Sequence, residues 1–104
     1  MVTHLAGAHG RPLPGVCAFN DETAIAVLAG MREHGLTVPA DLAVIGVDDI
    51  PTARLAVPPL TTVCFDLHEA GRRRAEAVVA ELSGRESHLA FVAADPRVIV
   101  RAST

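Results

Sequence analysis

The sequence predicts an α/β protein, with three αβα layers built around a mainly parallel sheet. Two observations support this prediction. Short apolar stretches alternate along the chain with longer segments whose apolar residues recur at helical spacing. In addition, the stretch Leu42–Val47 is apolar throughout, which indicates a strand buried on both faces and therefore a parallel sheet. Parallel strands joined through a helix require right-handed crossovers.

The first predicted strand is Gly15–Phe19, and it ends abruptly at polar side chains. Asn20 is placed to cap a helix that extends to about residue 34, because its side chain can accept a hydrogen bond from the first turn. Asp21 lies in that turn, where the positive end of the helix dipole favours a carboxylate. Gly35 suits the left-handed position that ends a helix. The apolar face of this helix consists of Ala24, Ile25, Leu28 and Met31.

Two shorter elements are predicted after the strand Leu42–Val47. Asp49 is placed to cap a short helix, Ile50–Ala56, whose first turn contains a proline. Two consecutive prolines then end this helix, because a residue that precedes proline is pushed out of the helical region. The third strand is predicted at Leu60–Phe65.

A second long helix is predicted from Asp66 to about residue 82 and is ended by a glycine. Asp66 and Glu69 have the spacing of a capping box, and Glu69 can pair with Arg73 one turn later. The consecutive arginines that follow Gly71 fan around the helix and are expected to form a solvated face. The apolar face of this helix consists of Leu67, Ala70, Ala75, Val78, Val79 and Leu82.

The two ends of the chain are less regular. Two final strands are predicted at His88–Ala94 and Arg97–Arg101, separated by an Asp-Pro pair. Residues 1–14 are interrupted by glycines and prolines and are expected to be irregular. A chain of 104 residues is expected to form one domain, here residues 15–104.

Composition excludes several classes of function. The net charge is −3 with neutral histidines, which argues against nucleic acid or an anionic membrane as the main partner of this chain. All nine basic residues are arginine, so chemistry that needs a lysine is excluded. Cys17 and Cys64 lie far apart in apolar stretches and are expected to be buried, reduced thiols.

The histidines have no metal-binding spacing, and neither a metal nor another cofactor is expected. No apolar stretch approaches the roughly 20 residues of a membrane span. The N-terminus also lacks the pattern of a signal peptide, so a cytoplasmic protein is expected.

Oxygen-bearing side chains follow two neighbouring strands of the predicted sheet. Asn20 and Asp21 come after the first strand, and Asp48 comes after the second. Ligands of open α/β sheets bind outside the carboxyl ends of the strands, so these residues are predicted to form part of a small-molecule site. A carboxylate beside an amide suits vicinal hydroxyls. The alternative for each residue is plain capping or turn chemistry, which we favour for Asp49.

Five short motifs occur in a fixed order along the chain. They are Phe-Asn-Asp-Glu-x-Ala at 19–24, Gly-Leu-x-Val-Pro-x-Asp at 35–41, Val-Ile-Gly-Val-Asp-Asp at 44–49, Pro-Pro-Leu-Thr-Thr-Val at 58–63 and Val-Arg-Ala-Ser-Thr at 100–104. Together they resemble the C-terminal part of the effector-binding domain of LacI/GalR transcriptional regulators, from about Arg11 to the end. The resemblance implies the C-terminal lobe of a type I periplasmic-binding-protein-like fold, in which two lobes close on a sugar, nucleoside or similar effector.

The resemblance also implies roles for individual residues. Asn20, Asp21 and Asp48 match effector contacts. Phe65 matches a position near the effector at the crossover between lobes; the alternative is a core aromatic. The family dimerises through surfaces that match Ile25, Leu28, Leu55, Ala56 and Val57. The alternative for this apolar set is the intramolecular core.

Other parts of the family have no match in these 104 residues. These 104 residues lack the helix-turn-helix that reads operator DNA, the hinge helix and nearly all of the N-terminal lobe. In the family, the helix that matches residues 66–83 packs in that lobe. Operator DNA would therefore be reached only through a segment outside this chain.

Three functions are compatible with these features. The sequence favours the effector-binding and dimerisation portion of a LacI-type repressor, without catalytic residues. The second is a lobe of a periplasmic-type sugar-binding protein, against which the repressor-like motifs argue. The third is a magnesium-dependent phosphoryl-transfer enzyme that uses the strand-end aspartates, but such sites generally need a lysine, and the chain has none.

Overall fold

The computed structural model describes residues 15–86 and 95–104. The predicted strand His88–Ala94 and the predicted irregular segment 1–14 lie outside the described residues. The chain divides into two compact units: the first extends to Cys64 and includes Val98–Thr104, and the second is Phe65–Arg97. Each unit is described by itself.

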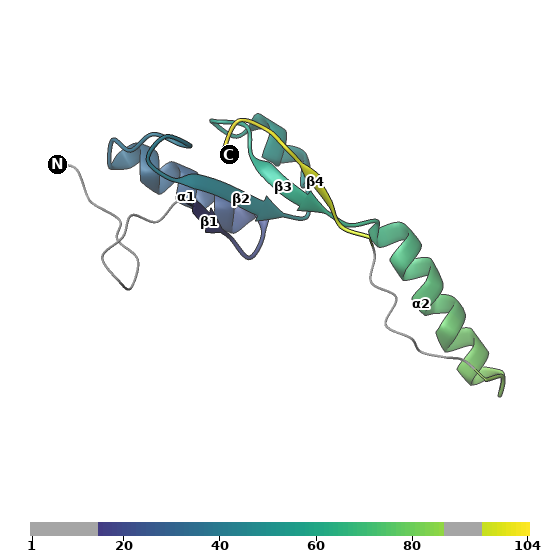
Figure 1. The fold of residues 1–104 in the computed structure, drawn as a ribbon. Helices are drawn as coiled ribbons and strands as arrows, with labels where there is room; N and C mark the ends of the chain where they lie inside the picture. The colour runs from purple at the N-terminus through teal and green to yellow at the C-terminus, as the bar shows by residue number, and fades with distance from the viewer. Residues whose placement is uncertain (1–14, 87–94) are drawn as a thin grey trace, which may run out of the picture. The chain divides into compact units, whose positions relative to one another are not determined.

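A four-stranded sheet has the order β1-β2-β3-β4 (Figure 1). Pairing of β1 with β2 and of β2 with β3 is parallel, which confirms the predicted parallel sheet. The chain beyond β4 runs antiparallel to β3, because Arg101 lies beside Thr61 and Ser103 lies beside Pro59. The strands are β1 (Gly15–Cys17), β2 (Ala43–Val47), β3 (Thr61–Cys64) and β4 (Arg97–Ile99).

Helix α1 (Asp21–Glu33) covers one face of this sheet and forms as predicted (Figure 1). The Asn20 side chain caps it by accepting a hydrogen bond from the Thr23 N–H at 2.8 Å. Gly35 follows with a φ of 69°, the left-handed conformation that glycine adopts without strain. The core lies between α1 and the sheet. Its buried side chains are Ala18, Ala24, Leu28, Met31, Leu42, Val44, Ala53 and Leu60.

Strand β2 is less evenly buried than predicted. Val44 and Gly46 are buried on the face toward α1, whereas Ala43, Ile45 and Val47 on the other face are only half-buried. The helical elements of the first unit, α1 and a short 3₁₀ helix, both pack on the core side.

The short helix after β2 is a 3₁₀ helix, Pro51–Leu55, with Ile50 in the capping position and no side-chain cap. The predicted cap by Asp49 is wrong. Its carboxylate instead accepts a hydrogen bond from the Arg101 guanidinium, in which both the donor and the acceptor group are charged.

Helix α2 (Leu67–Leu82) forms most of the second unit. Asp66 caps it by accepting from the Glu69 N–H at 2.9 Å, and the predicted pair between Glu69 and Arg73 is present at 2.7 Å. No residue of α2 is buried, so its apolar face is exposed in this structure. None of the described helices is long and apolar enough to cross a membrane.

The two cysteines depart in part from the predicted burial. Cys17 is a free thiol and is exposed, and Cys64 is half-buried. Cys17 belongs to the outermost strand and pairs in register with Ile45, on the face of the sheet that α1 does not cover. This position explains its exposure.

Candidate functional site

The carboxyl ends of β1 and β2 lie at the same edge of the sheet, because the two strands are adjacent and parallel. Asn20 follows β1 and is half-buried, and Asp48 follows β2 and is exposed. The Asn20 oxygen is used by the cap, whereas its amide nitrogen makes no hydrogen bond within the described residues. The Asp48 carboxylate likewise makes none there. A free donor group and a free acceptor group thus lie at this edge of the sheet, the carboxyl ends of β1 and β2, which we call the rim.

Asp21 occupies a different environment, since it is fully buried. One carboxylate oxygen, Oδ2, accepts a hydrogen bond from the Ile50 N–H at 2.9 Å, and Oδ1 accepts one from the Thr62 hydroxyl at 2.5 Å. Neither oxygen faces solvent. This geometry favours the structural alternative for Asp21, which joins the start of α1 to β3 and to the loop after β2.

Gly46 is what allows Asp21 to approach the sheet. A Cβ atom built at this position would overlap Asp21 Oδ1 and lie 3.1 Å from Asp21 Cα and 3.0 Å from Leu60 Cδ2. Any larger residue would push the first turn of α1 away from β2. The glycine of the Val-Ile-Gly-Val-Asp-Asp motif is therefore a close-approach residue.

Thr62 is a residue that the sequence-based prediction missed. Its buried hydroxyl donates to Asp21 and accepts from the Asp49 N–H at 3.3 Å. It thereby links α1, β3 and the loop that carries Asp48. The available signal was two consecutive threonines in an otherwise apolar strand, where a buried hydroxyl needs a partner.

The loop after β2 has an unusual backbone. Asp48 and Asp49 have φ values of 108° and 54°, and the Asp48 N–H donates to the Val63 carbonyl at 2.8 Å. The Asp49 carboxylate accepts from Arg101 Nη2 at 2.9 Å, and Arg101 Nη1 donates to the Leu60 carbonyl at 2.9 Å. This ion pair was also absent from the sequence-based prediction.

The last residues of the chain tie β2 to β3. The buried Ser103 hydroxyl donates to the Val44 carbonyl at 2.6 Å and accepts from the Thr61 N–H at 2.8 Å. The hydroxyls of Thr61 and Thr104 are 2.8 Å apart. The motifs at 58–63 and 100–104 therefore form one hydrogen-bonded unit, although they are distant in sequence.

The remaining site predictions are placed as follows. Phe65 is half-buried and opens the second unit, so its proposed contact with effector stays a prediction. Leu28 is 3% exposed and belongs to the core, which favours its intramolecular alternative. Ile25 and Ala56 pack partly against that core. Leu55 and Val57 are 72% and 68% exposed and remain available for an interface.

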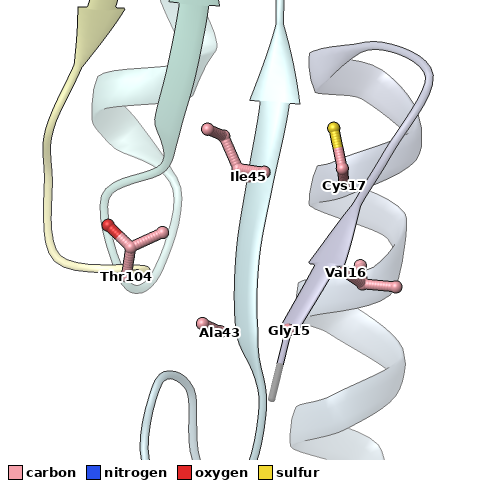
Figure 2. Close-up of a pocket in the computed structure, with 6 residues that line it drawn as sticks. All are labelled: Gly15, Val16, Cys17, Ala43, Ile45 and Thr104. Carbon is pink, nitrogen blue, oxygen red and sulfur yellow. The ribbon is translucent and has the colours of Figure 1, made fainter. Parts of the chain in front are cut away.

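A shallow pocket of about 420 Å³ lies on the face of the sheet that α1 leaves uncovered (Figure 2). The figure shows Cys17 and Ile45 on neighbouring strands, with Thr104 on the other side of β2. None of the predicted effector residues lines it. The lining residues are Gly15, Val16, Cys17, Ala43, Ile45 and Thr104.

The described residues contain no group of three or more histidine, cysteine or acidic side chains that could hold a metal ion. On α2, hydrogen bonds from Arg72 and Arg73 lower the pKa of Glu69 to about 2. The free groups at the rim are suited to hydrogen bonding.

The comparisons with known proteins agree on one family. The model of the periplasmic binding protein-like domain matches residues 2–104. The HTH-type transcriptional regulator DegA of Bacillus subtilis (strain 168) is 36% identical over 89 residues, which are 86% of this chain and 26% of DegA. The chain thus spans about a quarter of that relative. DegA is named as a regulator, which agrees with the prediction that this chain is not an enzyme.

Two solved structures share the fold. A LacI family regulator from Arthrobacter sp. FB24, in complex with lactose, is 39% identical with a TM-score of 0.71, covering 88% of this chain and 35% of that one. The CelR–cellobiose complex is 32% identical with a TM-score of 0.80, covering 88% and 28%. The chain belongs to the periplasmic binding protein-like domain family, in the form that LacI-type transcriptional regulators carry as their effector-binding domain.

Proposed function

We propose that the rim at the carboxyl ends of β1 and β2 forms one side of a binding site for a sugar or a similar polyhydroxyl effector. Asn20 and Asp48 are the contact residues in this proposal. The observation that carries it is the pairing of an unused amide donor with an unused carboxylate at the same rim. A sugar hydroxyl both donates and accepts, so it can satisfy both groups.

The comparisons support the same class of ligand. Two similar proteins have structures with lactose and with cellobiose, and both are assigned to transcriptional regulation. By this proposal the chain belongs to a cytoplasmic repressor in which effector binding changes operator affinity. The 104 residues themselves would bind no DNA, in keeping with their net charge of −3.

Direct titration tests the proposal. We expect lactose or cellobiose, added to the 104-residue chain, to shift the amide NMR signals of Asn20 and of the residues around Asp48. Asp48→Asn should weaken this binding about tenfold or more, because a hydrogen bond to a charged acceptor contributes roughly 1.5–3 kcal/mol. Glu33→Gln is the matched control, since Glu33 is an exposed acid at the far end of α1.

Binding that is saturable but equally strong in Asp48→Asn would contradict the assignment of Asp48. Shifts confined to the pocket around Cys17 and Ile45 would place the ligand on the uncovered sheet face instead. No binding of either sugar at high concentration, while the rim is correctly folded, would count against a sugar effector.

We further propose that the chain forms a homodimer through the exposed side chains of Leu55 and Val57, with Ile25 and Ala56 at the edge of the contact. The support is their exposure: these two large apolar residues lie two positions apart, with Leu55 as the last residue of the 3₁₀ helix and Val57 just after it. Leu28 is not part of this surface, because it is used in the core.

A further inference from the structure

The turn that carries Asp48 has a backbone that its residues do not prefer. Asp48 and Asp49 both have positive φ, at 108° and 54°, where the side chain of an L-residue crowds the backbone. Aspartate tolerates this region better than most residues, but two in succession need support from their surroundings. This backbone conformation sets the direction in which the Asp48 carboxylate projects from the rim.

Three interactions supply that support. The Asp48 N–H donates to the Val63 carbonyl, and the Asp49 N–H donates to the Thr62 hydroxyl. Among the interactions of the described residues, only the third, from Arg101 Nη2 to the Asp49 carboxylate at 2.9 Å, holds a side chain of the turn. Both members of this ion pair are largely sheltered, with exposed side-chain fractions of 19% for Arg101 and 25% for Asp49, so screening by salt is reduced.

Arg101 is itself held in place at several points. Its second guanidinium nitrogen donates to the Leu60 carbonyl at 2.9 Å, and its backbone N–H donates to the Thr61 hydroxyl at 2.8 Å. The backbone N–H groups of the next two residues, Ala102 and Ser103, both donate to the Pro59 carbonyl. The planar guanidinium thus bridges the start of β3 and the turn after β2, which the point charge of a lysine cannot do in the same way.

We propose that Arg101 is a positioning residue for the effector: through Asp49 it fixes the turn that presents the Asp48 carboxylate. The effector role of Asp48 rests on the proposed function, but the effect of Arg101 on the turn does not. The two ideas are therefore tested separately.

The first experiment needs no ligand. In Arg101→Gln, the NMR coupling constant that reports φ of Asp48 should change, and its amide should exchange with solvent at least about tenfold faster. Thr104→Val is the matched control, because it removes a hydrogen bond to Thr61 in the same terminal segment without touching the turn. Asp49→Asn gives a second route if Arg101→Gln fails to fold, because it removes the charge while keeping the shape.

The proposal is overturned if the φ-dependent coupling and the amide exchange of Asp48 are unchanged in a folded Arg101→Gln or Asp49→Asn variant. It is also overturned if Thr104→Val changes them equally, since the effect would then reflect the whole terminal segment. Both results are independent of whether any sugar binds.

The second experiment is a double-mutant cycle with lactose or cellobiose. Arg101→Gln should weaken sugar binding by roughly fivefold or more in the unmodified chain, but by much less when Asp48 is already asparagine. Equal losses in both backgrounds would contradict action through Asp48. If neither sugar binds the unmodified chain, the proposed function fails, while the ligand-free experiment still decides the role of Arg101.

Discussion

At the scale of single residues, the start of α1 depends on the absence of a side chain at position 46. The fully buried Asp21 fills the space above Gly46 and receives hydrogen bonds from Thr62 and Ile50. A buried carboxylate is tolerated because both of its oxygens have partners. The same contacts take Asp21 out of the rim, which leaves Asn20 and Asp48 as the groups that a ligand can reach.

Two glycine substitutions test this close approach. We expect Gly46→Ala to lower the free energy of unfolding by about 1–3 kcal/mol, because its Cβ overlaps Asp21 and crowds Leu60. Gly30→Ala is the control, since no atom lies within 4 Å of the Cβ that it would add in the middle of α1. That change should raise stability by roughly 0.5–1 kcal/mol through helix propensity.

Urea unfolding followed by circular dichroism measures both effects. Equal stability changes in the two variants would show that the space above Gly46 can relax at little cost. A Gly46→Ala protein as stable as the unmodified chain would remove the packing explanation for the glycine in this motif.

At the scale of elements, local sequence was enough to predict the helices but not the surroundings of the strands. The caps Asn20 and Asp66 and the left-handed Gly35 act within a few residues, and all three were predicted from their neighbours alone. The burial of β2 depends on what packs above each face, and its run of apolar residues does not encode that. The predicted parallel pairing was correct, whereas equal burial of both faces was not.

The candidate site shows the same division. The positions of Asn20 and Asp48 at one rim follow from strand direction, and the sequence predicted both. Thr62 and the pair of Arg101 with Asp49 connect residues 13 to 52 positions apart. The two consecutive threonines signal a buried hydroxyl that needs a partner, but no local pattern tells which residues the partners are. The prediction that Asp49 caps a helix failed for this reason: a distant guanidinium competes for its carboxylate.

The acidic–basic cluster on α2 gives a prediction about pH. Hydrogen bonds from Arg72 and Arg73 lower the pKa of Glu69 from 4.5 to about 2. A depressed pKa in the folded helix contributes stability that is fully present above about pH 4.5 and is lost as the pH falls toward 2. Because the side chains of Glu69 and its two arginine partners are 36% to 51% exposed to solvent, the effect on overall stability is small and decreases with added salt.

An NMR titration of the Glu69 carboxyl carbon measures this directly. Its midpoint should lie well below that of an unpaired glutamate, and it should rise in Arg72→Gln and to a lesser extent in Arg73→Gln. Arg74→Gln is the control, because Arg74 makes no ion pair with Glu69. An ordinary midpoint at low ionic strength would mean that the two arginines do not hold Glu69 in solution.

At the scale of the whole molecule, both units expose apolar side chains among the residues that the structure describes. The first unit has one half-buried sheet face, and no residue of α2 is buried. Large exposed apolar side chains occur in both units, including Leu55, Val57 and Leu82. Where such side chains form a contiguous surface, they mark contacts with other chains or with other parts of a protein.

Self-association distinguishes which of these surfaces the chain uses. We expect the chain to sediment as a dimer at high concentration, and Leu55→Ser should shift it toward monomer, because a 72% exposed leucine loses its apolar contact area. Leu82→Ser is the matched control: it removes an 83% exposed leucine from the end of α2, outside the proposed interface, and should leave the dimer intact. If Leu82→Ser produces monomers and Leu55→Ser does not, the apolar face of α2 is the contact and the surface around Leu55 and Val57 is not. A monomer at every concentration would instead reject the homodimer.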